Sequence, residues 1–154
     1  MTGPARVAAI HLAVALLLGA GTAQAAGCDE FISGRIADQI RAPIETAGCS
    51  YLGKAGVDKA NHKLESVCYT SSGPTSTVEI HASFSCRTGD KALIPFSTSD
   101  RVKATAEVRG SDCSVVDVKV NSSGEISKVA LGIFNANGQA RKALQTALNS
   151  LCRR

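Results

Sequence analysis

The sequence predicts an α+β fold, in which an antiparallel sheet of about five strands carries an N-terminal and a C-terminal helix on one face. Segments in the middle of the chain alternate apolar and polar residues at the period of a β-strand. Segments near both ends space their apolar residues as amphipathic helices do. Six cysteines follow an apolar leader, so covalent crosslinks are expected to supplement the core.

Residues 1–25 have the three parts of a secretory signal peptide. Arg6 is the only charge before an apolar run from Val7 to Ala20, and Ala23-Gln24-Ala25 forms a cleavage site of the A-x-A type. The run is shorter than the roughly 20 apolar residues that cross a bilayer. We therefore expect residues 1–25 to be a signal peptide and residues 26–154 to be a single disulfide-stabilised α+β domain, with no membrane span after signal removal.

The cysteines predict three structural disulfides, because their number is even and they lie behind an export signal. No two of them are within a few residues of each other, as zinc sites and dithiol redox centres require. Lipidation of Cys28 is an alternative that would leave an odd number for pairing. The pairing stays open, and a bond between Cys28 and Cys152 would tie the terminal helices together. The six are Cys28, Cys49, Cys68, Cys86, Cys113 and Cys152.

The first expected helix spans about 29–41. Apolar residues recur at three- and four-residue spacings from Phe31 onward, and Asp29 places negative charge at the start, where it complements the helix dipole. Pro43 lacks a backbone N–H, so we expect it to end this helix or to open a short second turn. Segment 47–63 has weak periodicity and is predicted to be a loop or a short helix.

Alternation of apolar and polar residues predicts the strands, and turn residues between them predict antiparallel neighbours. Segment 120–126 is interpreted as a further hairpin, with Gly124 near a position of positive φ, rather than as a capping box that opens a helix through Ile133. The expected strands are 65–70, 78–85, 102–109 and 116–120, with turns at 71–74 and 110–112.

The final helix is expected over 140–151, where an apolar stripe lies opposite polar residues. Asn135 and Asn137-Gly138 are expected to break the pattern before it, and Arg153 and Arg154 suit the dipole at its end. A cystatin-like or similar roll is compatible with this order of elements, although architecture does not carry function.

Charge and composition make nucleic acid an unlikely partner. The formal net charge is +4 and only 4% of residues are aromatic, whereas nucleic-acid binders usually combine a basic stripe with stacking aromatics. His62 is expected in an exposed loop before the first strand. Because His62 and His81 have no third ligand at coordinating spacing, we expect no metal and no cofactor.

The sheet face opposite the helices is the best candidate surface for chemistry. Glu79 and His81 project the same way at strand spacing, and a carboxylate and an imidazole can act as general base and acid. With Arg87 to stabilise phosphoryl charge, they predict the alternative function, a small secreted hydrolase such as a ribonuclease. The other interpretation is a solvated face that keeps the protein soluble. Basic residues expected to bind ligand on the neighbouring strand are Arg101, Lys103 and Arg109.

An apolar segment, Leu93-Ile94-Pro95-Phe96, falls between two strands. Its functional interpretation is a loop tip in which Leu93, Ile94 and Phe96 insert into a partner's cleft. The alternative is a short edge strand or a plug for the open end of the core, which is the commoner fate of an apolar run.

The function that these patterns favour is that of a secreted or periplasmic, non-enzymatic binding protein with a protein partner. Few titratable groups suit catalysis and none form a convergent cluster in the sequence, so no catalytic residue is assigned. An inhibitor or immunity protein for an extracytoplasmic enzyme or toxin fits this class.

Overall fold

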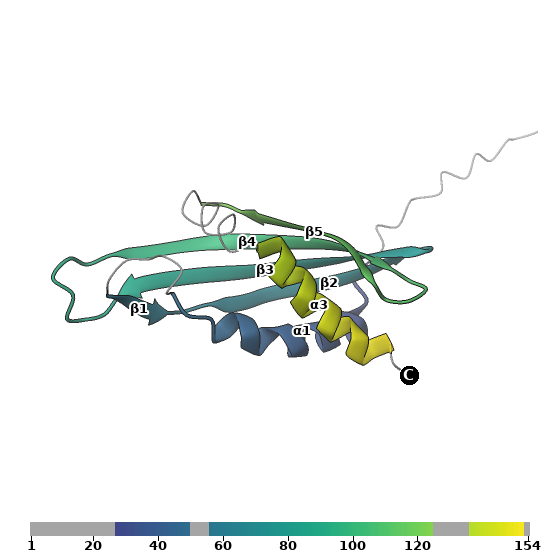
Figure 1. The fold of residues 1–154 in the computed structure, drawn as a ribbon, viewed down its shortest axis with the longest axis horizontal. Helices are drawn as coiled ribbons and strands as arrows, with labels where there is room; N and C mark the ends of the chain where they lie inside the picture. The colour runs from purple at the N-terminus through teal and green to yellow at the C-terminus, as the bar shows by residue number, and fades with distance from the viewer. Residues whose placement is uncertain (1–26, 50–55, 125–135, 153–154) are drawn as a thin grey trace, which may run out of the picture.

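The computed structural model describes residues 27–49, 56–124 and 136–152, and it confirms the predicted α+β fold (Figure 1). Within these residues, two helices pack on a five-stranded antiparallel sheet. The predictions for the signal peptide, for residues 125–126 of the last hairpin, for the alternative helix through Ile133 and for Arg153 and Arg154 lie outside these residues. In chain order the elements are α1 Glu30–Glu45, β1 Val57–Ala60, β2 Lys63–Ser72, β3 Thr75–Thr88, β4 Ser97–Arg109, β5 Val115–Ser122 and α3 Ala136–Cys152.

Strand β3 is the centre of the sheet. It pairs with β4 from Thr75 opposite Arg109 to Arg87 opposite Ser97, and β5 follows on the far side of β4. Strands β1 and β2 share the other edge of β3. The expected turn is present but shorter than predicted, at 73–74, because β2 continues to Ser72, which pairs with Thr75. Gly73 adopts a φ of 69° that few residues other than glycine tolerate.

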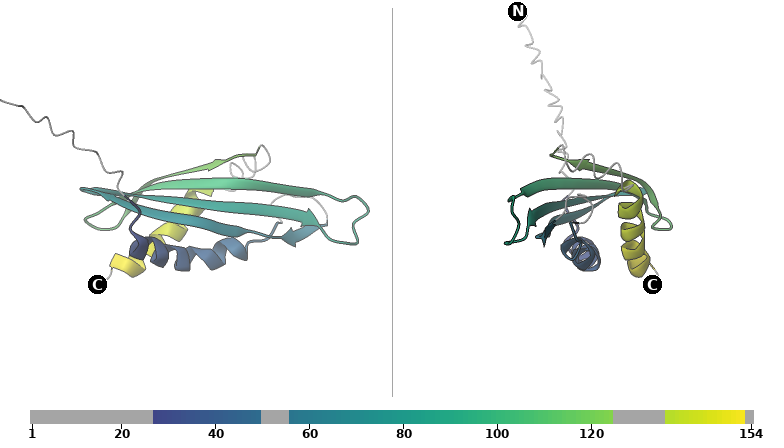
Figure 2. Two further views of the ribbon diagram at one scale, coloured as in Figure 1. Left: turned by 180° about the vertical axis from the view of Figure 1, so that it is seen from behind. Right: turned by 60° about the vertical axis from the view of Figure 1, so that its left-hand side comes forward.

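Both helices lie on the same side of the sheet (Figure 2), with α1 against β2 and α3 against β5. Strand alternation explains the core, because every second side chain faces this layer and meets the apolar stripes of the helices. The buried residues of the main core are Ile36, Ile40, Leu64, Val78, Ala106, Val108, Val115, Val118, Leu144, Ala147 and Leu148.

Helix α1 begins where expected and ends later than expected. Asp29 caps it by accepting a hydrogen bond from the Ile32 N–H at 2.9 Å. The expectation that Pro43 would stop the helix at residue 41 was wrong, since α1 runs through Pro43 to Glu45. The apolar stripe continues to Ile44, which packs against the main core and holds the last turn in place.

Three disulfides crosslink the chain, as predicted: Cys28–Cys68, Cys49–Cys86 and Cys113–Cys152. The suggested Cys28–Cys152 pair was wrong. The start of α1 lies along β2, where the Asp29 N–H donates to the Tyr69 carbonyl at 2.8 Å, so Cys28 meets Cys68. The end of α3 instead lies against the β4–β5 turn, which carries Cys113.

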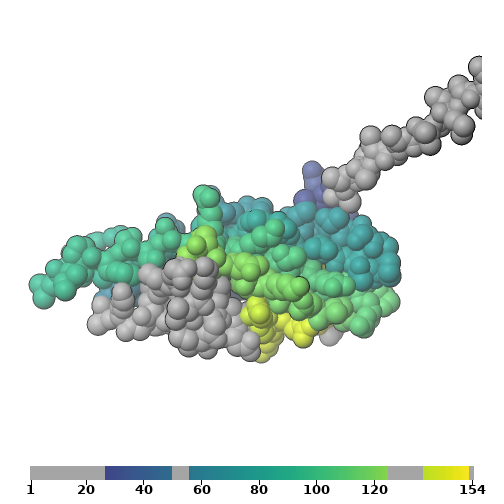
Figure 3. Space-filling model, turned by 90° about the horizontal axis from the view of Figure 1, so that it is seen from above, coloured from purple at the N-terminus to yellow at the C-terminus, as the bar shows by residue number. Residues whose placement is uncertain are grey.

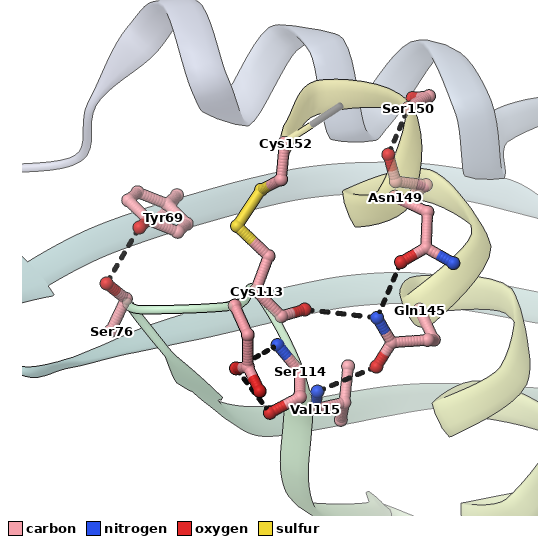
Figure 4. The surroundings of a disulfide bond; sticks show 11 residues. Tyr69, Ser76, Cys113, Ser114, Val115, Gln145, Asn149, Ser150 and Cys152 are labelled. Atoms are coloured by element: carbon pink, nitrogen blue, oxygen red, sulfur yellow. Dashed lines mark hydrogen bonds between the residues drawn. A yellow bond between two sulfur atoms is a disulfide. The ribbon is translucent and has the colours of Figure 1, made fainter. Parts of the chain in front are cut away.

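Polar side chains of α3 bind the outer edge of β5 (Figure 4). Gln145 accepts a hydrogen bond from the Val115 N–H at 2.7 Å and donates to the Cys113 carbonyl at 3.0 Å. Asn137 accepts from the Val120 N–H at 3.0 Å. Asn137 lies inside α3, which begins at Ala136, so the prediction that Asn137 would lie in a break before the helix was wrong. This coverage satisfies backbone groups that an edge strand otherwise exposes.

Candidate functional site

The hairpin end of the molecule comprises β1, the ends of β3 and β4 that adjoin it, and the loop 89–96 between β3 and β4. It extends beyond both helices (Figure 1), and the space-filling view shows the loop as a narrow projection (Figure 3). Long antiparallel pairing of β3 with β4 carries the loop to this position. This end is the candidate functional site.

The base of the loop is fixed by hydrogen bonds. The Thr88 N–H donates to the Phe96 carbonyl at 2.9 Å, and the Phe96 N–H donates to the Thr88 hydroxyl at 3.0 Å. The Gly89 N–H donates to the Gly56 carbonyl at 3.1 Å. The loop therefore leaves the sheet in a defined direction.

The apolar residues of the loop divide into an anchor and a tip. Phe96 is half-buried and packs on a small cluster of Cys49, Val57 and Cys86. Leu93 is 100% exposed and Ile94 is 80% exposed. Burial, the alternative interpretation of this segment, applies to Phe96 alone, and the pair Leu93-Ile94 forms the exposed hairpin tip.

His62 is buried rather than exposed, so the prediction of an exposed loop was wrong. Only 4% of the residue is exposed, and its ring lies 4.8 Å from that of Phe84. Its Nδ1 accepts a hydrogen bond from the Ser85 N–H at 3.2 Å, which leaves the proton of the neutral ring on Nε2. Burial lowers the pKa of His62, against a smaller opposing effect of the Gly48 backbone.

The reason for the misplacement is that β1 and β2 are almost continuous. Asn61 exchanges two backbone hydrogen bonds with Ser85, at 2.9 and 3.2 Å, so the strand alternation passes through the gap between β1 and β2. His62 thus faces the interior together with Leu64. The polar neighbours Asn61 and Lys63 had suggested a loop, and the strand β1 was itself predicted as a loop or a short helix.

His62 lies beside two sulfur atoms, which raises the question of a metal centre. A donor nitrogen of His62 and the sulfurs of Cys49 and Cys86 lie within 4.8 Å of one another. The two sulfurs are bonded to each other, so they offer no thiolate, and Nδ1 already accepts a hydrogen bond. In its disulfide form this cluster is a packing element of the small core.

Glu79 links two cationic or potentially cationic side chains on the sheet face away from the helices. Its carboxylate lies 2.7 Å from His81 Nε2 and 2.7 Å from Lys103 Nζ. The hydrogen bond from His81, and then that from Lys103, lowers the pKa of Glu79. A carboxylate held ionised in this way is a weaker base than a free one.

The remaining site residues predicted from the sequence do not contact Glu79 or His81. Arg87 lies six positions along β3 from His81, roughly 20 Å away at the rise of a strand, and binds Asp90 at 3.1 Å. Arg109 lies at the opposite end of the face and binds Asp112 at 3.3 Å. Arg101 is exposed next to Lys103 along β4, on the hairpin side.

Sequence reasoning missed two residues that share this face. Lys59 lies opposite Arg87, and Lys63 lies opposite Ser83. The alternation of Lys59, Asn61 and Lys63 was the available signal, but it was hidden by the weak periodicity assigned to segment 47–63.

The fold and this site define a class of protein: an α+β fold braced by three disulfides, suited to an oxidising extracytoplasmic environment, with a hairpin that projects beyond its helices. The chain belongs to the Y4fE family, whose model matches residues 30–152. The match takes in every described helix and strand. No curated protein and no solved structure matches the chain. Within the described ranges, no helix has both the length and the apolar character needed to cross a membrane.

Proposed function

We propose that the protein is a binding protein, secreted or periplasmic after loss of residues 1–25, that docks on a partner protein and catalyses no reaction. An inhibitor or immunity protein for an extracytoplasmic enzyme or toxin is the form we favour. The observation that carries the proposal is the exposure of the hairpin tip, 100% for Leu93 and 80% for Ile94. Two adjacent large apolar side chains at the tip of a hairpin whose base is held by hydrogen bonds suit insertion into an apolar cleft.

The energetics support docking by the hairpin tip. Moving a fully exposed Leu or Ile side chain into an apolar cleft contributes about 1.5–3 kcal/mol. The loop base is already held by Phe96 and by the Thr88 hydrogen bonds, so the backbone at the base has little conformational entropy left to lose on binding.

Photo-crosslinking in cells that export the full chain tests this proposal. A photoreactive amino acid replaces Leu93 in one variant and Lys142, which is exposed on α3, in a control variant. We expect one discrete protein adduct from position 93 and none from position 142. No adduct from position 93, or the same adduct from both positions, contradicts docking by the hairpin tip.

One observation favours the hydrolase alternative, namely the 2.7 Å contact between Glu79 and His81. The distance along β3 to Arg87 weighs against a phosphodiester site on this face, and so does the lowered pKa of Glu79, which makes it a weaker base. We expect purified protein to leave RNA intact. RNA cleavage that His81→Ala abolishes without unfolding the protein would replace binding with hydrolysis.

A further inference from the structure

The sheet face away from the helices has an uneven charge distribution. We call the end opposite the hairpin, where α1 and α3 cover the sheet, the braced end. Toward the braced end this face mixes signs, since Glu107, Asp117 and Lys119 lie near one another across β4 and β5. Toward the hairpin end the cross-strand pairs bring basic side chains together. These residues, the basic patch, are Lys59, Lys63, Arg87, Arg101 and Lys103.

Strand register places the basic patch on one surface. Lys59 lies directly opposite Arg87, and Ser83 lies between Lys63 on β2 and Arg101 on β4. Residues directly opposite each other share a face, with Cβ atoms about 4.5–5.5 Å apart. All five basic residues are exposed. The basic patch therefore spans four strands, β1 to β4, with its charges directed to solvent.

Only part of this charge is compensated within the protein. Asp90 binds Arg87 at 3.1 Å, and Glu79 binds Lys103 at 2.7 Å. In the described part of the chain, no ion pair involves Lys59, Lys63 or Arg101. Lys59 lies directly opposite Arg87, and like charges in this position repel each other, so the basic patch suits an external anion.

We propose that the basic patch docks the protein on an anionic phospholipid membrane surface. Neither described helix covers this face of the sheet (Figure 2), and its cations are spread over a broad surface rather than gathered round a small ligand. A lipid surface offers negative charge with the same two-dimensional spread. This proposal is independent of the proposed protein partner, which docks on the hairpin tip.

The expected effect follows from the uncompensated cations. Each Lys or Arg close to an anionic bilayer raises affinity about fivefold, so Lys59, Lys63 and Arg101 together predict a preference of roughly 100-fold for anionic over neutral vesicles. Added salt screens exposed charges and should weaken the binding.

Co-sedimentation of the mature protein with vesicles tests the proposal. The probe is phosphatidylcholine mixed with phosphatidylglycerol, compared with phosphatidylcholine alone. The test variant is Lys59→Gln/Lys63→Gln/Arg101→Gln, and the matched control is Arg109→Gln/Lys119→Gln/Lys142→Gln, which removes the same net charge from exposed positions elsewhere. Thermal unfolding of each variant establishes that it is folded.

We expect the wild type and the control to bind the anionic vesicles and the test variant to lose most of that binding. Equal loss in both variants would mean that net charge alone matters, and no binding by the wild type would mean that no lipid surface is recognised. Either result overturns the proposal. A Leu93→Ser/Ile94→Ser variant separates the two proposals. If Leu93→Ser/Ile94→Ser abolishes vesicle binding and the basic-patch variant does not, then the hairpin tip binds lipid. That result contradicts both proposals, docking of the basic patch on a membrane and docking of the hairpin tip on a protein.

Discussion

The two ends of the molecule use the same sheet in different ways. At the braced end, α1 and α3 cover the sheet, Cys28–Cys68 and Cys113–Cys152 fix the helices to it, and α3 side chains bind the β5 edge. At the hairpin end, Cys49–Cys86 and Phe96 close a small core. The exposed hairpin tip lies beyond this small core, and the basic patch lies on the sheet face away from the helices, between Arg87 and Lys103.

The difference between the two ends distinguishes residues that maintain the fold from residues that are free to contact a partner. At the braced end most apolar side chains are buried in the main core and α3 binds backbone groups of the β5 edge, although Phe31 is 69% exposed and Val116 is 40% exposed. At the hairpin end Leu93 and Ile94 remain exposed, although they are as apolar as the core residues. Substitutions at the two ends should therefore separate effects on stability from effects on binding.

The largest expected loss of stability comes from a disulfide of the braced end. Cys113→Ser/Cys152→Ser opens a crosslink between residues 39 apart, and chain entropy predicts a decrease of about 4 kcal/mol in the free energy of unfolding. Cys49→Ser/Cys86→Ser at the hairpin end, with a separation of 37, should lose a similar amount by the same chain-entropy argument. Urea denaturation measures both. A loss below about 1 kcal/mol in the first variant would contradict the bracing role.

The next effect concerns the main core. Leu148 is 2% exposed, so Leu148→Ala should lower the free energy of unfolding by about 3 kcal/mol through lost burial and a cavity. Lys142→Ala, on the exposed side of the same helix, should change it by less than about 0.5 kcal/mol. Similar changes in the free energy of unfolding for the two variants would show that Leu148 does not contribute to the main core.

A smaller effect is expected at the loop anchor. Phe96 is half-buried, so Phe96→Ala should lower the free energy of unfolding by about 1.5 kcal/mol. Ser97→Ala, at the exposed neighbouring position, serves as the control. Chemical denaturation that finds Phe96→Ala no different from this control would show that Phe96 does not anchor the loop.

The smallest expected effect is a change of slope with pH at His62. Its pKa is lowered in the folded protein from 6.5, so below that pH the unfolded state takes up the proton first. The stability from neutral His62 is present above about pH 6.5 and is lost as the pH falls toward the lower folded pKa. His62→Phe should flatten the decline in unfolding free energy between about pH 7.5 and about pH 5.5. If the slope of the unfolding free energy against pH is the same in His62→Phe as in the wild type, burial of His62 does not cause the decline.

The fold was predictable because its signals are local. Strand alternation in β3 and β4 and the helical stripe of α3 each lie within one short segment, so sequence periodicity located them. The even cysteine count predicted full pairing, and the partners depended on contacts between distant segments that no local pattern contains.

The candidate site was predictable only in part. Leu93 and Ile94 could be named as an apolar segment, but whether such a segment is buried depends on how far the hairpin extends beyond the helices. The basic patch joins Lys63 to Arg101 through strand register, and register is set by the whole sheet. His62 was misplaced because its neighbours are polar while the strand alternation directs it inward.

The most direct test of the division between the two ends is the free energy of unfolding of Leu93→Asp/Ile94→Asp, measured against the wild type by urea denaturation. Because the hairpin tip makes no contribution to the core, we expect a change within about 0.5 kcal/mol. A loss above about 2 kcal/mol would show that these side chains are packed in the fold, and the hairpin tip could then not be a free contact surface.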